Sequence, residues 1–236
     1  GTSQRTIAVG LIPCIASKIV YSRDKVIGQN LQNKNIEISQ MKLLDFLLEQ
    51  DGIGADAEKI ERAAWDTFGA KVAVLNIDSV GFSRTTKSHG IVHFLTRMAK
   101  ARACMTSVLN EMDVISFGYH ADNCIAYFDT PQKAVVAAIK LQKAVSKSGI
   151  TLNETEQYGL CAGIGFGDLL YSETLDGYFG DEMNLASRLG EDTAERDEIL
   201  LTEAAYHGLE ATDKWRAEER TLSASGVNMT YFALLL

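Results

Sequence analysis

Residues 72–83 read Val-Ala-Val-Leu-Asn-Ile-Asp-Ser-Val-Gly-Phe-Ser, and this stretch decides the fold. The unbroken apolar run at 72–77 predicts a strand that is buried on both faces and ends at Asp78. Residues 78–83 then predict a tight turn, whose free backbone amides can cradle a phosphate beside the Asp78 carboxylate. The alternative is that Asp78 only caps a following helix.

Outward from this strand, hydrophobic periodicity predicts a mixture of helices and strands. The predicted elements are a helix at 86–110, a hairpin of strands at 114–117 and 124–128, a helix that begins at 130–131, an extended strand at 160–171, a helix at 184–189, a short strand at 199–201 and a last strand at 227–235. The order β, α, β, β, α, β is typical of an α+β sandwich of the ferredoxin-like type, with helices on one face of the sheet.

Residues 1–68 form a separate N-terminal helical segment in this interpretation, and residues 69–236 form the second domain. Apolar residues recur at helical spacing around 41–48 and again around 60–64, and Gly52 and Gly54 interrupt the pattern between them. A helical brace or a dimer contact is the simplest role for this segment, and a regulatory role is the alternative.

Composition excludes several classes of protein. The chain of 236 residues is 46% hydrophobic and 23% charged, which is typical of globular proteins with a sizeable core. A formal net charge of −8 argues against a general nucleic-acid binder. Four widely separated cysteines indicate reduced thiols, and no apolar run is long enough for a membrane span. We therefore expect a cytoplasmic protein with neither nucleic acid nor a membrane as partner.

A second carboxylate, Asp122, lies in the predicted hairpin turn, 44 residues after Asp78. A hairpin beside the first strand brings the two side chains together, and their charges then repel. Two close carboxylates are tolerated when divalent cations lie between them, and Mg²⁺ favours one or two carboxylates together with substrate phosphate oxygens. An exposed hairpin aspartate is the alternative.

A third motif covers residues 178–188, Tyr-Phe-Gly-Asp-Glu-Met-Asn-Leu-Ala-Ser-Arg. Asn184 and Arg188 are four residues apart and therefore share one face of a helix. An amide and a guanidinium that project together suit a polyphosphate ester, in which the amide orients a sugar oxygen and the guanidinium meets charge on phosphorus. Taken alone, the pair is also typical of an ordinary helix surface.

In combination these motifs resemble the catalytic domain of class III nucleotide cyclases over roughly residues 70–236. The resemblance rests on the first aspartate with its Gly-Phe turn, the hairpin aspartate, the glycine-rich strand at 163–167, and the segment from Tyr178 to Arg188. It implies a phosphorus–oxygen lyase that acts on a nucleoside triphosphate, with two Mg²⁺ or Mn²⁺ ions per active site.

The resemblance also implies a homodimer with two shared active sites. One protomer would supply the metal-binding residues Asp78, Ser79 and Asp122, and the other would supply the catalytic residues Asn184 and Arg188. The turn residues expected to contact the substrate are Val80, Gly81, Phe82 and Ser83.

Two positions depart from the pattern of purine cyclases. Such enzymes usually read the base with Lys or Glu four residues before the second metal aspartate, and with Asp, Thr or Cys seven residues before the asparagine. Gly118 and Gly177 occupy these positions here. Neither glycine can hydrogen-bond a base edge through a side chain, so the purine contacts are absent.

Bulkier side chains near these glycines favour a pyrimidine pocket. The residues expected to line it are Phe117, Tyr119, His120 and Tyr178, and the alternative for each is an ordinary core or loop position. This pattern resembles the pyrimidine cyclases of the Pycsar anti-phage systems, which convert UTP or CTP to the cyclic monophosphate that activates a separate effector protein. We expect UTP in preference to CTP.

Two other functions stay open at this point: an adenylate or guanylate cyclase with an atypical base pocket, and an inactive cyclase-like domain that binds nucleotide or only dimerises. The late lysine that many members of the family use on the triphosphate is absent from residues 221–230. Arg84, Arg216 and Arg220 are the candidates to replace it.

Overall fold

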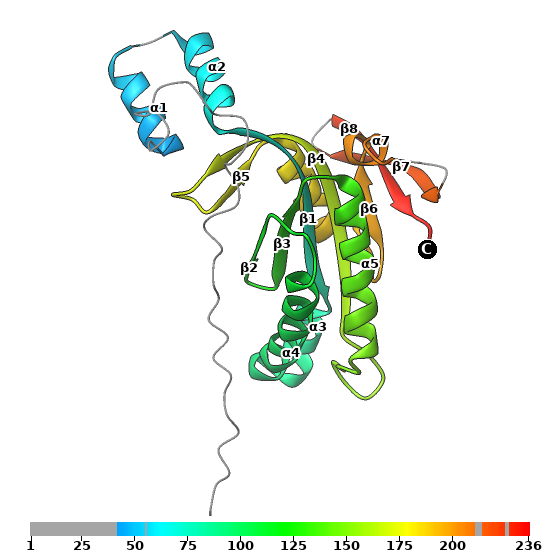
Figure 1. Ribbon diagram of the computed structural model, residues 1–236. Coiled ribbons are helices and arrows are strands. Elements are labelled where there is room, and N and C mark those ends of the chain that lie inside the picture. Colours follow the sequence, from blue (N-terminus) through cyan, green and yellow to red (C-terminus); the bar gives the residue numbers. More distant parts are fainter. Residues whose placement is uncertain (1–41, 55, 211–213, 225–226) are drawn as a thin grey trace, which may run out of the picture. The chain divides into compact units, whose positions relative to one another are not determined.

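The computed structural model describes residues 42–54, 56–210, 214–224 and 227–236. Its centre is an eight-stranded sheet in the order β2-β3-β1-β4-β6-β8-β7, and β5 pairs with β4 beside this path (Figure 1). The strands are β1 (Gly69–Val80), β2 (Ser116–His120), β3 (Asn123–Phe128), β4 (Gly159–Ser172), β5 (Gly177–Phe179), β6 (Ile199–Thr202), β7 (Ala217–Ala224) and β8 (Val227–Leu234).

Helices connect and flank these strands. They are α1 (Leu43–Gly52), α2 (Ala57–Phe68), α3 (Phe82–His89), α4 (Ile91–Asn110), α5 (Pro131–Lys147), α6 (Asp181–Arg188), the π-helical turn η2 (Leu189–Thr193) and α7 (Glu203–His207). The predicted helix start at 130–131 is confirmed by its cap, since Thr130 accepts from the backbone N–H of Lys133. Thr202 caps α7 in the same way by accepting from the backbone N–H of Ala205.

The first part of the sheet has the ferredoxin-like arrangement. Strand β1 lies between β3 and β4 and is antiparallel to both, and β2 is antiparallel to β3 on the outer side. Helix α4 precedes β2, and α5 connects β3 to β4 through the loop at 148–158. The order β2-β3-β1-β4 confirms the predicted α+β, antiparallel-rich fold.

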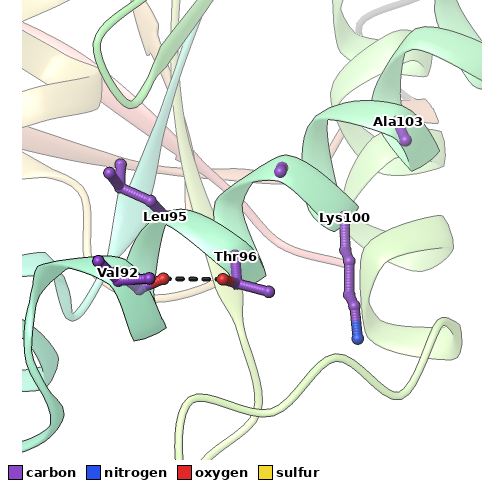
Figure 2. Close-up of a pocket in the computed structure, with 6 residues that line it drawn as sticks. Val92, Leu95, Thr96, Lys100 and Ala103 are labelled. Carbon is purple, nitrogen blue, oxygen red and sulfur yellow. Dashed lines mark hydrogen bonds between the residues drawn. The ribbon is translucent and has the colours of Figure 1, made fainter.

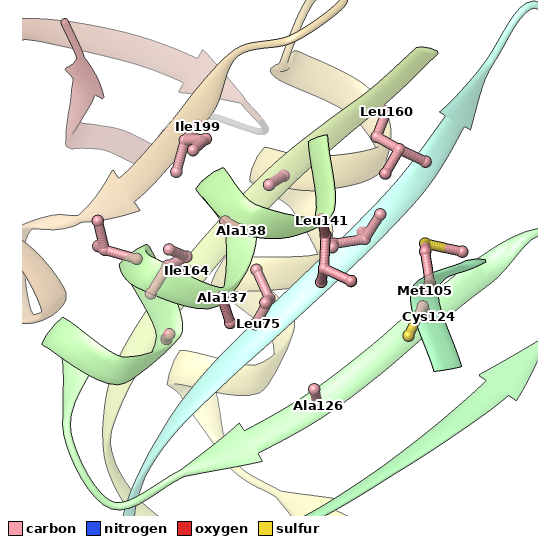
Figure 3. Close-up of a cluster of buried hydrophobic side chains, with 14 of the residues drawn as sticks. Leu75, Met105, Cys124, Ala126, Ala137, Ala138, Leu141, Leu160, Ile164 and Ile199 are labelled. Atoms are coloured by element: carbon pink, nitrogen blue, oxygen red, sulfur yellow. The ribbon is translucent and has the colours of Figure 1, made fainter. Parts of the chain in front are cut away.

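Alternation along β1 separates two apolar layers. Ala73, Leu75 and Ile77 belong to the main core, where α4 and α5 cover one face of the sheet (Figure 3). Val72 and Val74 belong to a smaller cluster on the opposite face, together with buried residues of β3, β4, β5 and α6. We call the first face the α4/α5 face and the second the α6 face.

Two expectations need correction. The predicted single helix at 86–110 is two helices, because Gly90 between α3 and α4 adopts φ +85°, which only glycine takes up readily. Strand β7 was not expected from the sequence. It reads Ala-Glu-Glu-Arg-Thr-Leu-Ser-Ala and lies at the edge of the sheet, where charged side chains are common and leave no apolar run to detect.

The described part of the N-terminal segment consists of α1 and α2, as the periodicity predicted. Leu43, Phe46 and Ala64 are buried together, and Leu170 of β4 packs against them. Helix α2 continues directly into β1 at Gly69. Residues 1–41 of the predicted segment lie outside the described residues, and the division of the chain at 68/69 stays a prediction.

Within the described ranges, no helix is long and apolar enough to cross a membrane. Cys104, Cys124 and Cys161 are free thiols, as expected, and Cys14 lies outside the described residues.

Candidate active site

The register of β1 and β3 brings the two predicted metal-binding aspartates together. Ile77 is opposite Cys124, so one rung further Asp78 faces Asn123, and Ser79 faces Asp122 in the hairpin turn. The Ser79 hydroxyl donates to Asp122 Oδ2 over 3.2 Å, and Asp78 Oδ1 accepts from the backbone N–H of Ser79 over 2.7 Å. Ser79 therefore contacts both carboxylates.

The electrostatics of this pair favour a cation. Burial raises the pKa of the Asp78 carboxyl from 3.8 to about 6, the Ser79 backbone N–H lowers it, and the negative charges of Asp122 and Glu191 raise it. Among the described residues no group of three or more His, Cys, Asp or Glu side chains gathers around one point. Two carboxylates beside the backbone of a turn nevertheless fit Mg²⁺ or Mn²⁺, because such ions complete their shells with water and substrate phosphates.

The hairpin tip that carries Asp122 is fastened to α4. The Arg102 guanidinium donates to the carbonyl oxygen of Ala121 and lies 4.8 Å from the centre of the Tyr119 ring. The Tyr119 hydroxyl is 2.9 Å from Thr106 Oγ1 and donates to the Arg102 carbonyl over 3.2 Å. Asp122 thus lies in a turn with fixed contacts on both strands and on α4.

These contacts also place the predicted base-pocket residues of β2. Phe117 and Tyr119 pack against the main core, so their side chains lie on the α4/α5 face of the sheet. By alternation, Gly118 and His120 lie on the α6 face, and His120 is exposed. The structure therefore does not bring Phe117 and Tyr119 to the face on which Asp78 lies.

The turn after Asp78 has the expected form. Gly81 has φ +97° and caps the start of α3, where its carbonyl accepts from the backbone N–H of Thr85. Phe82 is 39% exposed and meets Phe94 edge-on, with ring centres 4.9 Å apart. Val80 is half-buried, and Ser83 is exposed at the start of α3.

Arg84 is the cationic side chain beside this turn. It pairs with Glu156 at 2.5 Å, and a β-carbon added at Gly81 would lie 3.4 Å from its guanidinium. Arg220, by contrast, is held between Glu198 and Glu218, and Arg216 is exposed. Of the three candidates to replace the missing lysine, only Arg84 is placed at the turn.

Helix α6 presents the predicted catalytic pair. Asn184 and Arg188 are both exposed, and neither side chain has a hydrogen-bond or ion-pair partner within the described part of the chain. The helix lies very close to β4, because β-carbons added at Gly163 and Gly165 would come within 2.1 and 2.3 Å of the carbonyl oxygens of Ala186 and Glu182. The glycine-rich strand is therefore what lets α6 approach the sheet.

The remaining predicted residue, Tyr178, is buried on the α6 face in a group of three tyrosines. Its ring centre lies 4.6 Å from that of Tyr127 and 5.0 Å from that of Tyr171. A β-carbon at Gly177 would be 3.7 Å from the Tyr127 hydroxyl, whereas one at Gly118 would have nothing within 4 Å. Sequence reasoning missed Tyr127, although its alternation with the core residues Ala126 and Phe128 was a usable signal.

Two pockets lie elsewhere. A groove of 580 Å³ runs along the outer side of α4 and is lined by Val92, Leu95, Thr96, Ala99, Lys100 and Ala103 (Figure 2). A second pocket, of 660 Å³, lies where α2, β1, β4 and α6 meet and is lined by Trp65, Asp66, Gly69, Ala70, Lys71, Asp168, Gly180, Asp181 and Glu182. Neither contains a predicted site residue.

Comparison with known proteins supports the same architecture through structure alone. No family model matches the sequence, and no curated protein matches it. Solved structures do match. One is the catalytic core of a rhodopsin-guanylyl cyclase with converted specificity in complex with ATPαS, with a TM-score of 0.61 and 14% sequence identity. This match covers 71% of the present chain and 98% of the cyclase chain. The protein has the fold of class III cyclase catalytic domains.

Further cyclases agree with this fold. The adenylyl cyclase CyaB from P. aeruginosa has a TM-score of 0.59 at 18% identity, over 71% of this chain and 94% of its own. Another match is a non-canonical dimeric guanylyl cyclase domain of the RhoGC fusion protein from the aquatic fungus Blastocladiella emersonii, with a TM-score of 0.57 and 16% sequence identity. It covers 71% of the present chain and 97% of that domain's chain.

Proposed function

We propose that the protein is a pyrimidine nucleotide cyclase that converts UTP, or CTP, to the 3′,5′-cyclic monophosphate and pyrophosphate. The observation that carries the proposal is the contact between Asp78, Ser79 and Asp122 at the end of β1, in a fold shared with nucleotide cyclases. The exposed pair Asn184 and Arg188 on α6 supplies an amide to orient the ribose and a guanidinium to bind the α-phosphate.

Asp78 and Asp122, with backbone oxygen at Ser79, are the residues that would hold two divalent cations. When bound, such ions lower the pKa of the ribose 3′ hydroxyl and neutralise the charge of the β- and γ-phosphates. The amides of the turn at 80–83 bind phosphate oxygens, and Arg84 extends this binding towards the terminal phosphates.

The transfer itself is internal to one nucleotide. The 3′ hydroxyl gives up its proton to water, its oxygen bonds to the α-phosphorus, and the bond from the α-phosphorus to the oxygen that bridges it to the β-phosphorus breaks. Pyrophosphate leaves with that electron pair. Asn184 orients the ribose, and Arg188 donates hydrogen bonds to the α-phosphate as its charge shifts in the transition state. Catalysis in such transfers comes mainly from positioning and charge neutralisation.

A second protomer completes each site in this proposal. Asn184 and Arg188 are exposed and have no partner among the residues that the structure describes, as expected for side chains that act on a substrate held by another chain. One structurally similar guanylyl cyclase domain is described as a non-canonical dimer, so assembly into dimers occurs in this fold. Asp78→Ala and Arg188→Ala, each inactive alone, should therefore regain activity when mixed, because a mixed dimer keeps one intact site.

Preference for a pyrimidine is supported by the α6 face of the sheet. Gly118 and Gly177 carry no group that can read a purine edge, and the Tyr127 hydroxyl lies beside Gly177. His120 and Tyr178 lie on the same face, His120 exposed and Tyr178 buried. Phe117 and Tyr119 take a different role from the one first expected, since they support the hairpin from the α4 side.

The test is product identification. Purified protein is incubated with each of the four ribonucleoside triphosphates and Mg²⁺ or Mn²⁺, and products are identified by mass, with Asp78→Asn as the inactive control. Cyclic UMP or cyclic CMP supports the proposal, cyclic AMP or GMP replaces it with a purine cyclase, and absence of any product replaces it with an inactive binding domain.

We place the enzyme in the cytoplasm, as the source of a second messenger for anti-phage defence through a separate effector protein. This role rests on the resemblance to Pycsar cyclases. It predicts that cells lose protection against phage when Asp78→Asn replaces the wild-type chain beside its effector, as measured by plaque counts.

A further inference from the structure

We infer that Asn76, Ser187 and Glu191 form a positioning cluster that sets Arg188 for catalysis in the active site to which α6 contributes. The inference rests on the proposed function and adds residues that act through Arg188 without touching substrate. We call these three residues the Asn76 cluster.

The contacts are specific. Asn76 is 0% exposed in β1, and its Nδ2 donates to Ser187 Oγ over 2.8 Å and to Glu191 Oε1 over 2.9 Å. Ser187 is the residue before Arg188, and Glu191 is three residues after it. Both donor hydrogens of one buried amide therefore hold the two sides of the turn that carries the guanidinium.

An apolar side chain would be the simpler choice at this position. Asn76 lies in a strand whose neighbours Val74 and Leu75 are fully buried and apolar, and its own Oδ1 is buried with no hydrogen-bond partner in the described part of the chain. An unsatisfied buried carbonyl weakens the folded state. Burying the Asn76 amide therefore lowers stability, and the two hydrogen bonds from its Nδ2 to Ser187 and Glu191 offset that loss.

At its C-terminal end, helix α6 is also held by the fully buried Leu189, which follows Arg188, and by the Gly190 carbonyl, which accepts from Cys161 Sγ over 3.2 Å. Ala186 is its one buried residue. At the other end Glu182 accepts from the backbone N–H of Phe166 over 2.9 Å and from the Thr202 hydroxyl over 2.6 Å. The helix is therefore held by polar contacts at both ends, and Asn184 and Arg188 project from the stretch between Glu182 and Glu191.

The main alternative is that the cluster serves the metal-binding half of the site. Asn76 is two residues before Asp78, and the Glu191 charge acts on the Asp78 carboxyl. In a dimer with shared sites the two possibilities differ sharply, because Asp78 and Arg188 of one chain then belong to different active sites. A mixed dimer can therefore show which half is damaged.

The first measurement is steady-state kinetics of the full chain. Glu191→Ala should lower kcat at least tenfold and change KM for the nucleotide less than threefold, because Arg188 acts on charge that develops in the transition state. Glu191→Gln keeps an oxygen that accepts from Asn76 and should recover most of kcat. The matched control is Asp192→Ala, which removes the neighbouring exposed carboxylate and should change kcat less than threefold.

The second measurement is complementation. Glu191→Ala mixed with Asp78→Ala should recover about a quarter of wild-type activity, because half of the dimers are mixed and each has one intact site. Glu191→Ala mixed with Arg188→Ala should stay at or below the level of Glu191→Ala alone. The reverse pattern, or a wild-type kcat in Glu191→Ala, overturns the inference.

A third measurement does not depend on activity. Hydrogen–deuterium exchange of the backbone at 184–190 should be faster in Glu191→Ala and Ser187→Ala than in the wild type and Asp192→Ala. If the wild type makes no cyclic nucleotide but exchange follows this order, the proposed function fails and the positioning of α6 stands. If exchange is the same in all four proteins, the Asn76 cluster does not position α6.

Discussion

Replacing Asp78 by asparagine should stabilise the metal-free protein at neutral pH. The pKa of the Asp78 carboxyl is raised from 3.8 to about 6, mainly by burial, so the folded state binds its proton more tightly than the unfolded state does. Ionisation of Asp78 therefore opposes folding. Asparagine keeps an oxygen that accepts from the Ser79 backbone N–H and carries no charge.

The size of the effect follows from the two pKa values. Their difference corresponds to about 3 kcal/mol at 1.36 kcal/mol per pH unit, and since Asp78 is only partly buried we expect about 1–2 kcal/mol. Below about pH 4 both states are protonated and the gain vanishes. It appears as pH rises from about 4 to 6 and is complete above about pH 7.

The assay is urea unfolding in the presence of a chelator at pH 4, 6 and 8. The control is Asp168→Asn, which neutralises an exposed aspartate of β4 and should change the unfolding free energy by less than about 0.5 kcal/mol. Addition of Mn²⁺ should reverse the order at pH 8, because only the wild type gains binding energy. A gain for Asp78→Asn that is absent at pH 8, or that grows towards pH 4, would refute the reasoning.

Three further predictions concern the fold around the site. Gly163→Ala should destabilise the protein by about 1–3 kcal/mol and abolish turnover, because its β-carbon would lie 2.1 Å from the Ala186 carbonyl oxygen. The control Gly52→Ala adds a β-carbon with no atom within 4 Å and should leave stability and turnover unchanged. Thermal unfolding measures the stability, and product formation measures the turnover. Arg102→Ala should raise the Mn²⁺ concentration for half-maximal activity, since the hairpin tip loses its contact with α4, and an unchanged titration would contradict that role. Gly118→Lys combined with Gly177→Asp should raise turnover of ATP relative to UTP, as read from product masses; an unchanged ratio would place the base elsewhere.

Much of the site could be predicted because its signals are local. The placement of Asp78 and Asp122 on either side of Ser79 follows from a hairpin that folds back beside a buried strand, and the shared face of Asn184 and Arg188 follows from helical spacing. The start of α5 was equally clear from its threonine and proline.

What escaped prediction depends on contacts between distant residues. Alternation shows that Phe117 and Tyr119 share a face, but only the packing of β2 against α4 decides which face it is. The partners of Asn76 are 111 and 115 residues away, and a polar residue within an apolar strand gives no indication of them.

The two-residue connection between β2 and β3 has a consequence for how substrate choice can evolve. Ala121 and Asp122 make up the whole connection. An insertion or deletion there would therefore shift the Asp122 carboxylate relative to β1. Gly118 lies on the third rung of the β2–β3 ladder counted from this connection, and a β-carbon added there meets no atom within 4 Å. Under the proposed function, a lineage could therefore change the nucleobase read at that rung while the hairpin turn that carries Asp122 keeps its geometry.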